Sequence, residues 1–131
     1  MFVDASAFCA ILLGEPDRNS FEERLAAVNG ATTSAIAIWE TARSLVRGKG
    51  LSVAAARAEV EAYLALAEIR VVAVGESEAG VAIDAFARFG NGVHPAKLNM
   101  GDCFAYACAK TNGVPLLYKG GDFALTDIEP A

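Results

Sequence analysis

Short apolar runs that alternate with helix-like segments constrain the fold of this chain more than any other feature. We expect strands at 2–4, 31–33, 69–74 and 115–118, and a last short strand in 125–129. These runs are almost continuously apolar, which is typical of parallel strands that are buried on both faces. Strands that alternate with helices predict a parallel sheet with helices packed on both sides of it.

The segments between these runs carry apolar residues at helical spacing and end at glycine, asparagine or proline. The expected helices cover 5–14, 17–29, 35–47, 53–67, 77–89 and 99–112. In such α/β sheets the functional site lies outside the carboxyl ends of the strands, where the strand order reverses. Candidate functional residues are therefore sought at that edge of the sheet.

The bulk composition limits the class of protein. A length of 131 residues suits one domain over 1–131, and 54% hydrophobic residues suffice for a packed core. The net charge of −5 argues against a wide basic surface for nucleic acid, although bound metal ions can supply positive charge locally. No apolar run is long enough to span a bilayer and the start does not resemble a signal peptide, so we expect a cytoplasmic protein. The cysteines lack metal-ligand spacing and are expected in the core: Cys9, Cys103 and Cys108.

Four acidic residues are expected at the same edge of the predicted sheet. Asp4 ends the first strand, and Asp122 follows the 115–118 strand by four residues. Glu40 and Asp102 lie in the first turns of two helices. In a parallel α/β sheet, the carboxyl ends of strands and the first turns of the following helices share one edge. The spacing therefore predicts that these carboxylates converge.

Converging carboxylates repel one another, so a cation must compensate them. Only Arg43, Lys97 and Lys119 are basic side chains that could do so from within the chain. A hard divalent cation is the more economical partner, because Mg²⁺ or Mn²⁺ prefers oxygen ligands and uses only a few carboxylates. A site of this kind suits the hydrolysis of phosphodiester bonds.

Each acid also has a simpler interpretation that the residues alone leave open. Asp4 could cap the first helix, and Asp102 could form an N-terminal cap with Asn99. Asp122 could be a turn residue after two glycines. Glu40 is harder to explain in this way, because it lies on a helix otherwise lined by apolar and small residues.

Three segments resemble the PIN-domain ribonucleases, and within them the VapC toxins of bacterial toxin–antitoxin pairs. "MFVDASAFCAILLGEPD" is similar to the family's opening, and "TTSAIAIWETARSL" resembles its second motif. "HPAKLNMGDCFAYACAKTNGVPLLYKGGDF" resembles the most specific part of the family. The resemblance implies a three-layer α/β/α sandwich in which a central parallel sheet of about five strands is flanked by helices. It also implies a metal-dependent endoribonuclease that hydrolyses RNA.

The resemblance assigns catalytic roles to Asp4, Glu40, Asp102 and Asp122. It implies that Asp4 and Asp102 bind Mg²⁺ or Mn²⁺ directly, and that Glu40 and Asp122 contribute through water. Ser6 matches a small hydroxyl position that assists the site. The partners implied are an RNA substrate, a small VapB-like antitoxin and a second copy of the chain in a homodimer.

The chain departs from the family's pattern at one position. Many relatives carry two acids where this chain reads Tyr118-Lys119-Gly120-Gly121-Asp122, so that glycine replaces the first. This departure and the acidic pI support an alternative function, a non-catalytic PIN-fold module whose acidic groove binds a basic peptide or partner.

Weaker signals concern substrate contacts. Arg43 and Lys97, together with Ser6, are candidate substrate-binding residues. Trp39 could stack a nucleobase. However, its place on an apolar helix stripe with Ile36 favours packing in the core. His94 is expected to be a loop residue rather than a catalytic base.

Overall fold

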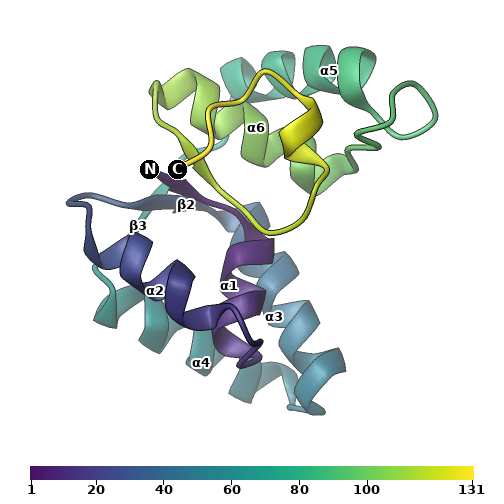
Figure 1. Ribbon diagram of the computed structural model, residues 1–131. Helices are drawn as coiled ribbons and strands as arrows, with labels where there is room; N and C mark the ends of the chain where they lie inside the picture. The colour runs from purple at the N-terminus through teal and green to yellow at the C-terminus, as the bar shows by residue number, and fades with distance from the viewer.

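Four short strands form one parallel sheet in the computed structural model, which describes residues 1–131. The strands are β1 (Phe2–Val3), β2 (Thr32–Ser34), β3 (Arg70–Val72) and β4 (Leu116–Leu117). Their order across the sheet is β3-β2-β1-β4, and every pair is parallel (Figure 1). The helices are α1 (Ala5–Leu12), α2 (Arg18–Ala26), α3 (Ala35–Lys49), α4 (Val53–Leu66), α5 (Glu76–Phe89) and α6 (Met100–Asn112).

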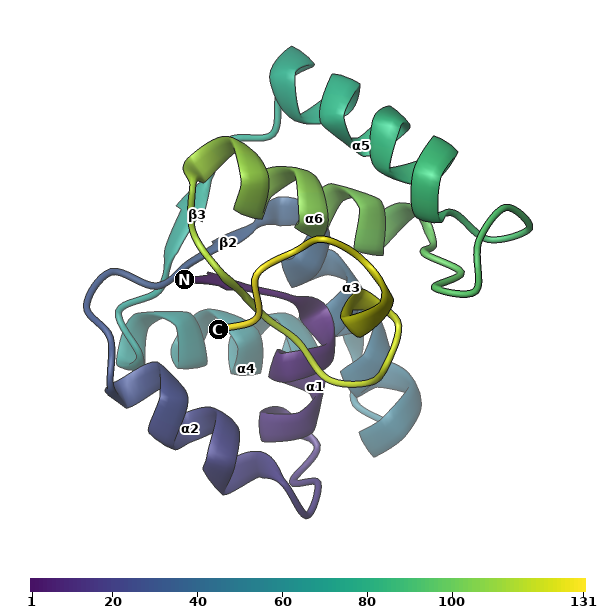
Figure 2. The ribbon, with the colours of Figure 1, turned by 45° about the horizontal axis from the view of Figure 1, so that its top comes forward.

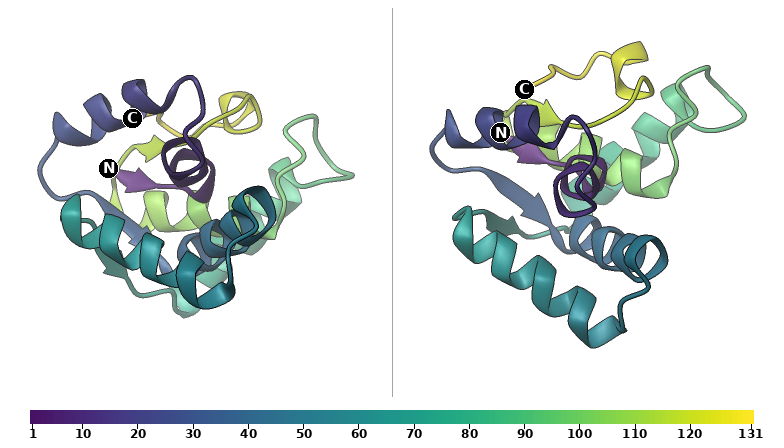
Figure 3. Two further views of the ribbon diagram at one scale, coloured as in Figure 1. Left: turned by 90° about the horizontal axis from the view of Figure 1, so that it is seen from below. Right: turned by 60° about the horizontal axis from the view of Figure 1, so that its bottom comes forward.

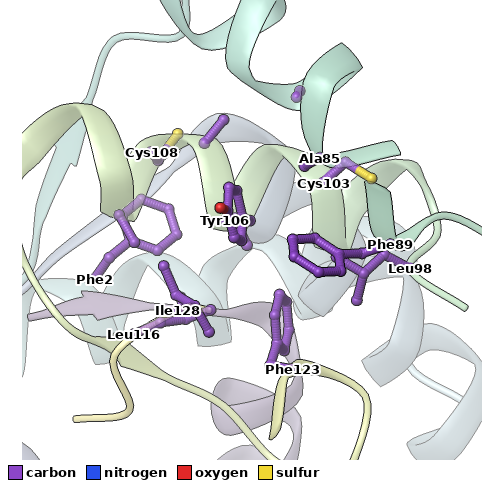
Figure 4. Close-up of a cluster of buried hydrophobic side chains, with 14 of the residues drawn as sticks. Phe2, Ala85, Phe89, Leu98, Cys103, Tyr106, Cys108, Leu116, Phe123 and Ile128 are labelled. Atoms are coloured by element: carbon purple, nitrogen blue, oxygen red, sulfur yellow. The ribbon is translucent and has the colours of Figure 1, made fainter. Parts of the chain in front are cut away.

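The sheet separates two layers of helices, as predicted for a three-layer sandwich. α5 and α6 cover one face, and α1 to α4 lie on the other (Figures 1 and 2). The alternation of side chains along β1 and β4 explains this arrangement. Phe2 and Leu116 are paired in register and belong to the cluster of buried side chains under α5 and α6 (Figure 4). Val3 and Leu117, the next pair in register, pack with α1 and α2 instead.

The order of the strands creates a switch point between β1 and β4. From β1 the chain adds β2 and then β3 on one side, with α1 to α4 on one face. It then passes through α5 and α6 on the other face and returns to pair β4 with the free side of β1. The carboxyl ends of β1 and β4 are therefore the place where an open α/β sheet forms its binding crevice.

The predicted fifth strand is wrong as a regular element. Residues Phe123–Leu125 form a short 3-10 helix, and only a single bridge joins Pro130 to Leu116. Thr126 explains the interruption, because its hydroxyl donates to the carbonyl of Phe123 at 2.7 Å and accepts from the amide of Ile128 at 3.2 Å. These bonds turn the chain within the predicted strand. The segment rejoins the sheet only at its end, where the amide of Ala131 donates to the carbonyl of Leu116 at 2.9 Å.

Other boundaries differ from the predictions by a few residues at most. β3 is shorter than predicted, at Arg70–Val72, and α5 begins at Glu76 rather than at Ser77. The start of α5 is set by Glu78, whose carboxylate accepts a hydrogen bond from the amide of Gly75 at 2.8 Å. Both ends of the chain lie beside each other at the amino ends of β1 and β4, away from the switch point (Figure 3).

The prediction that the cysteines lie in the core is confirmed for two of the three. Cys103 and Cys108 are buried in the α5–α6 cluster, and Cys9 is partly buried. None of the helices combines the length and the apolar character that crossing a membrane requires.

Candidate functional site

Asp4 lies at the carboxyl end of β1, directly at the switch point. It is 3% exposed, and its amide donates to the carbonyl of Leu117 on β4 at 2.9 Å. Its Oδ2 caps α1 by accepting from the amide of Ser6 at 2.9 Å and from the Ser6 hydroxyl at 2.5 Å. Burial raises the pKa of Asp4, and the bonds from Ser6 oppose that rise. The capping interpretation of Asp4 is therefore correct, and it fixes a buried carboxylate at the expected edge.

Glu40 reaches the same place from α3. This helix starts at the switch-point edge because Ser34 ends β2 and caps α3, accepting from the amide of Ala37 at 3.2 Å. The Glu40 carboxylate lies against Gly101 in the first turn of α6, so closely that a Cβ there would sit 2.2 Å from Oε1. Burial raises the pKa of Glu40 to about 7, and the negative charges of Asp4 and Asp102 add to the rise.

Asp102 points from the first turn of α6, where it forms a reciprocal cap with Asn99. Its amide donates to Asn99 Oδ1 at 3.1 Å, and its Oδ2 accepts from the amide of Asn99 at 2.8 Å. Burial raises the pKa of Asp102 to about 6, despite the bond from Asn99, and the charges of Asp4 and Asp122 contribute. Asp102 thus caps α6 and also belongs to the group of acids at this edge of the sheet.

Asp122 lies at the margin of this group. It is exposed, precedes the 3-10 helix and makes no side-chain capping bond. Its charge adds to the pKa rise of Asp102 but not to that of Asp4 or Glu40. The structure therefore brings Asp4, Glu40 and Asp102 together as an acidic cluster, with Asp122 beside Asp102.

The donor set of the acidic cluster fits a hard cation that keeps most of its water. As arranged here, no three acidic, histidine or cysteine side chains already surround a common point. Asp4 and Asp102 each use Oδ2 for the bonds to their own helices. Mg²⁺ is suited to such a site, because it binds proteins through one or two carboxylates and retains several waters.

The basic side chains do not neutralise the acidic cluster directly. Arg43 is exposed and lies over the ring of Trp39, 5.7 Å from its centroid, where its charge opposes the pKa rise of Glu40. Lys97 is exposed and makes no ion pair with the cluster. Lys119 pairs with Glu15 and Asp17 instead. The negative potential of the cluster is thus left for an outside cation.

Two features of the site were mistaken or missed in the sequence analysis. Trp39 is 62% exposed, so its predicted place in the core is wrong. The buried side of α3 is formed by Ala37, Thr41 and Leu45, because small residues let the helix pack closely. Gly101 was not recognised as the residue that admits Glu40, although a glycine inside a first helical turn is a usable signal. His94 is a loop residue as expected, with Nδ1 accepting from the amide of Ala96 at 3.1 Å.

The PIN-domain family matches residues 1–129 of this chain, which include the sheet and the acidic cluster at its switch point. A ribonuclease VapC of Mycolicibacterium smegmatis is 41% identical over 98% of this chain and 97% of its own length. Ribonuclease VapC30 of Mycobacterium tuberculosis is 41% identical over 98% of this chain and 95% of its own, and a VapC ribonuclease of Rhizobium meliloti is 39% identical over 97% and 98%. The chain therefore belongs to the VapC ribonucleases of the PIN-domain family.

The fold agrees with a solved structure of the same kind. VapC20 of Mycobacterium tuberculosis, a toxin that cleaves the sarcin–ricin loop, superposes with a TM-score of 0.74 over 99% of this chain and 97% of its own. The sequence identity is 19%, so this likeness concerns the fold alone. The predicted family and the predicted α/β/α fold are both confirmed.

Proposed function

We propose that this chain is a metal-dependent endoribonuclease that hydrolyses RNA phosphodiester bonds and acts as the toxin of a toxin–antitoxin pair. The observation that carries the proposal is the acidic cluster. Burial raises the pKa of each of its carboxyl groups, and repulsion by neighbouring acids adds to the rise at Glu40 and Asp102. Three buried or half-buried carboxylates close together at the switch point of the sheet raise the free energy of the folded chain unless a cation binds there.

Asp4 and Asp102 would hold Mg²⁺ or Mn²⁺, since each is fixed by bonds to its own helix and does not depend on the ion for its orientation. When bound, the ion supplies an activated water and stabilises charge on the leaving oxygen. Glu40 is suited to orient a water beside the ion, because its carboxylate lies close enough to Asp4 and Asp102 for their charges to raise its pKa. Asp122 would act through water, from beside Asp102.

The remaining site residues have lesser roles in this proposal. Ser6 holds the Asp4 carboxylate with two hydrogen bonds. Arg43 lies within electrostatic reach of Glu40, where it would meet a phosphate of the RNA backbone. Lys97 is exposed in the loop before α6 and would contact the RNA further from the scissile bond.

The proposed partners are a VapB-like antitoxin and a second copy of the chain, and the proposed compartment is the cytoplasm. A basic segment of the antitoxin would complement the acidic cluster. A homodimer is supported by an apolar patch formed by Trp39, Ile83, Phe86 and Met100, all more than half exposed. Met100 lines one hollow with Ile83 and Phe86 and another with Trp39, so the patch is continuous.

The direct test is cleavage of an RNA panel by the purified protein with Mg²⁺, with Mn²⁺ and with EDTA. Cleavage is expected with either metal, and its loss is expected in EDTA and in Asp4→Asn and Asp102→Asn. Asp84→Asn, an exposed acid on α5, is the matched control and should cleave normally. Cleavage that persists in EDTA and in both site variants would refute the proposal.

The alternative of a non-catalytic module rests on Gly120, which replaces an acid of the family's pattern and has a φ of 103° that favours glycine. Calorimetry with Mn²⁺ separates the two functions. Binding that disappears in Asp102→Asn supports the nuclease, whereas an acidic groove that binds a basic peptide and no metal supports the module.

A further inference from the structure

The ammonium group of Lys119 is held by two acids from another part of the chain. Lys119 follows β4, whereas Glu15 and Asp17 lie in the turn between α1 and α2. Lys119 Nζ contacts the Glu15 carboxylate and lies 2.8 Å from Asp17 Oδ1. This pairing raises the pKa of Lys119 and lowers that of Asp17. These three residues form a lysine clasp.

The main chain of Lys119 lies next to the acidic cluster. Its amide donates to the Ser6 hydroxyl at 2.9 Å, and that hydroxyl donates to Asp4 Oδ2 at 2.5 Å. Only two hydrogen bonds therefore separate the backbone of Lys119 from the carboxylate of Asp4. The lysine side chain is a flexible four-carbon stem, so its ammonium group can take up different positions around this backbone.

Two groups of carboxylates compete for the ammonium group of Lys119. One is the pair Glu15 and Asp17, whose side chains are partly exposed to solvent. The other is the acidic cluster, where buried carboxylates attract a cation but where the ammonium group would also have to give up its water. An ammonium group that moved to the cluster would occupy the position of a metal ion and oppose its charge.

We propose that the lysine clasp keeps the ammonium group of Lys119 away from the acidic cluster and so preserves that cluster for a divalent cation. The inference rests on the proposed metal-dependent function. Lys119 is then a positioning residue: its amide orients Ser6, while its side chain is restrained by Glu15 and Asp17. The hydrogen bond from the Lys119 amide to the Ser6 hydroxyl does not involve the lysine side chain, so it remains in Lys119→Ala.

The first test needs neither metal nor activity. Zero-length carbodiimide coupling joins an ammonium group to a carboxylate in contact with it, and mass spectrometry of the digested protein identifies the partner. In the metal-free native protein, Lys119 is expected to couple to Glu15 or Asp17. In Glu15→Gln/Asp17→Asn it is expected to couple to Asp4, Glu40 or Asp102, and failure to couple there would overturn the proposal.

The second test measures Mn²⁺ affinity by calorimetry. Glu15→Gln/Asp17→Asn should bind Mn²⁺ about tenfold more weakly, because a freed cation a few ångströms away opposes a dication even at a protein surface. Adding Lys119→Ala to this variant should restore the affinity towards that of the native chain. Unchanged affinity in the double variant, or no recovery in the triple variant, would overturn the proposal.

A control variant shows whether a change in Mn²⁺ affinity comes from the lysine clasp or only from the change in net charge. Glu22→Gln/Glu23→Gln on α2 changes the net charge by the same amount and leaves the lysine clasp intact, so its Mn²⁺ affinity should match that of the native chain. If the native chain binds no Mn²⁺, the proposed metal-dependent function fails, and the coupling experiment still decides where the ammonium of Lys119 lies.

Discussion

At the scale of single residues, Gly101 decides whether Glu40 can join the acidic cluster. Gly101→Ala should place a methyl group where Oε1 of Glu40 now lies, since the new carbon would be 2.2 Å from that oxygen, far below contact distance. Displacing a catalytic group by about an ångström can cost about a hundredfold in rate, so RNA cleavage should fall by up to about that factor. The measurement is kcat/KM on a cleaved RNA.

The matched control for this substitution is Gly80→Ala on α5, where a Cβ would meet nothing within 4 Å. It should leave cleavage unchanged and raise stability by about 0.5–1 kcal/mol, because alanine favours a helix more than glycine does. Normal cleavage by Gly101→Ala would show that the position of Glu40 does not matter for the reaction.

The raised pKa of Glu40 predicts an unusual dependence of stability on pH. Its pKa is about 7 in the folded chain against an ordinary value of 4.5, so the folded state retains a proton that the unfolded state loses. The contribution to stability is fully present below pH 4.5 and is lost as the pH rises through about 7. The metal-free protein should therefore melt at a higher temperature at about pH 5.5 than at about pH 8.

Glu40→Gln tests the origin of this effect by thermal melts in EDTA. The variant should be less sensitive to pH over this range and more stable than the native chain at about pH 8, since it carries no charge to desolvate. Saturating Mn²⁺ should likewise raise the melting temperature of the native chain at the higher pH. Equal pH dependence in the two proteins would contradict the assignment to Glu40.

The positions of the acids could be predicted from sequence, but their surroundings could not. A residue that ends an apolar strand or opens the next helix must lie at the carboxyl edge of a parallel sheet, which located Asp4, Glu40 and Asp102. The contact between Glu40 and Gly101 depends on how α3 crosses α6, and no local pattern encodes that crossing. The exposure of Trp39 was missed for the same reason, because it depends on which side of α3 packs against its neighbours.

At the scale of elements, one polar cluster fastens the chain after β4 to α5 and α6. The hydroxyl of the buried Tyr106 donates to Asp127 Oδ1 at 2.6 Å, and Arg88 pairs with Asp127 Oδ2 at 2.9 Å. Lys110 donates to the carbonyl of Asp127 at 3.0 Å. This attachment replaces the regular fifth strand, which turn-forming hydrogen bonds prevent and which apolar patterning alone could not exclude.

Tyr106→Phe should lower the free energy of unfolding by about 1 kcal/mol, the typical net contribution of one hydrogen bond. Tyr118→Phe is the control, because the Tyr118 hydroxyl has no hydrogen bond like the one from Tyr106 to Asp127, and its effect should stay within about 0.5 kcal/mol. Urea denaturation measures both. Equal destabilisation by the two substitutions would show that the bond to Asp127 contributes nothing.

At the scale of the whole molecule, the apolar patch predicts self-association. Trp39→Glu should convert a dimer into a monomer, because it places a charge on a surface that would lose contact with water. Light scattering after size-exclusion chromatography gives the molar mass. Leu66→Glu, also well exposed but on α4 and outside the patch, should leave the mass unchanged. If the native chain is monomeric at all concentrations, the prediction of self-association is wrong.

The main-chain bonds between β1 and β4 are better protected from solvent than the segment that follows β4. The amides of Phe2 and Asp4 are buried and bonded to the carbonyls of Pro115 and Leu117 at 2.8 and 2.9 Å, so they should exchange with deuterium only when the whole domain unfolds. Asp122 follows two exposed glycines, and amides there should exchange within seconds. The strands at the base of the crevice are therefore as durable as the fold itself, whereas the segment after β4 can adapt to the shape of what enters.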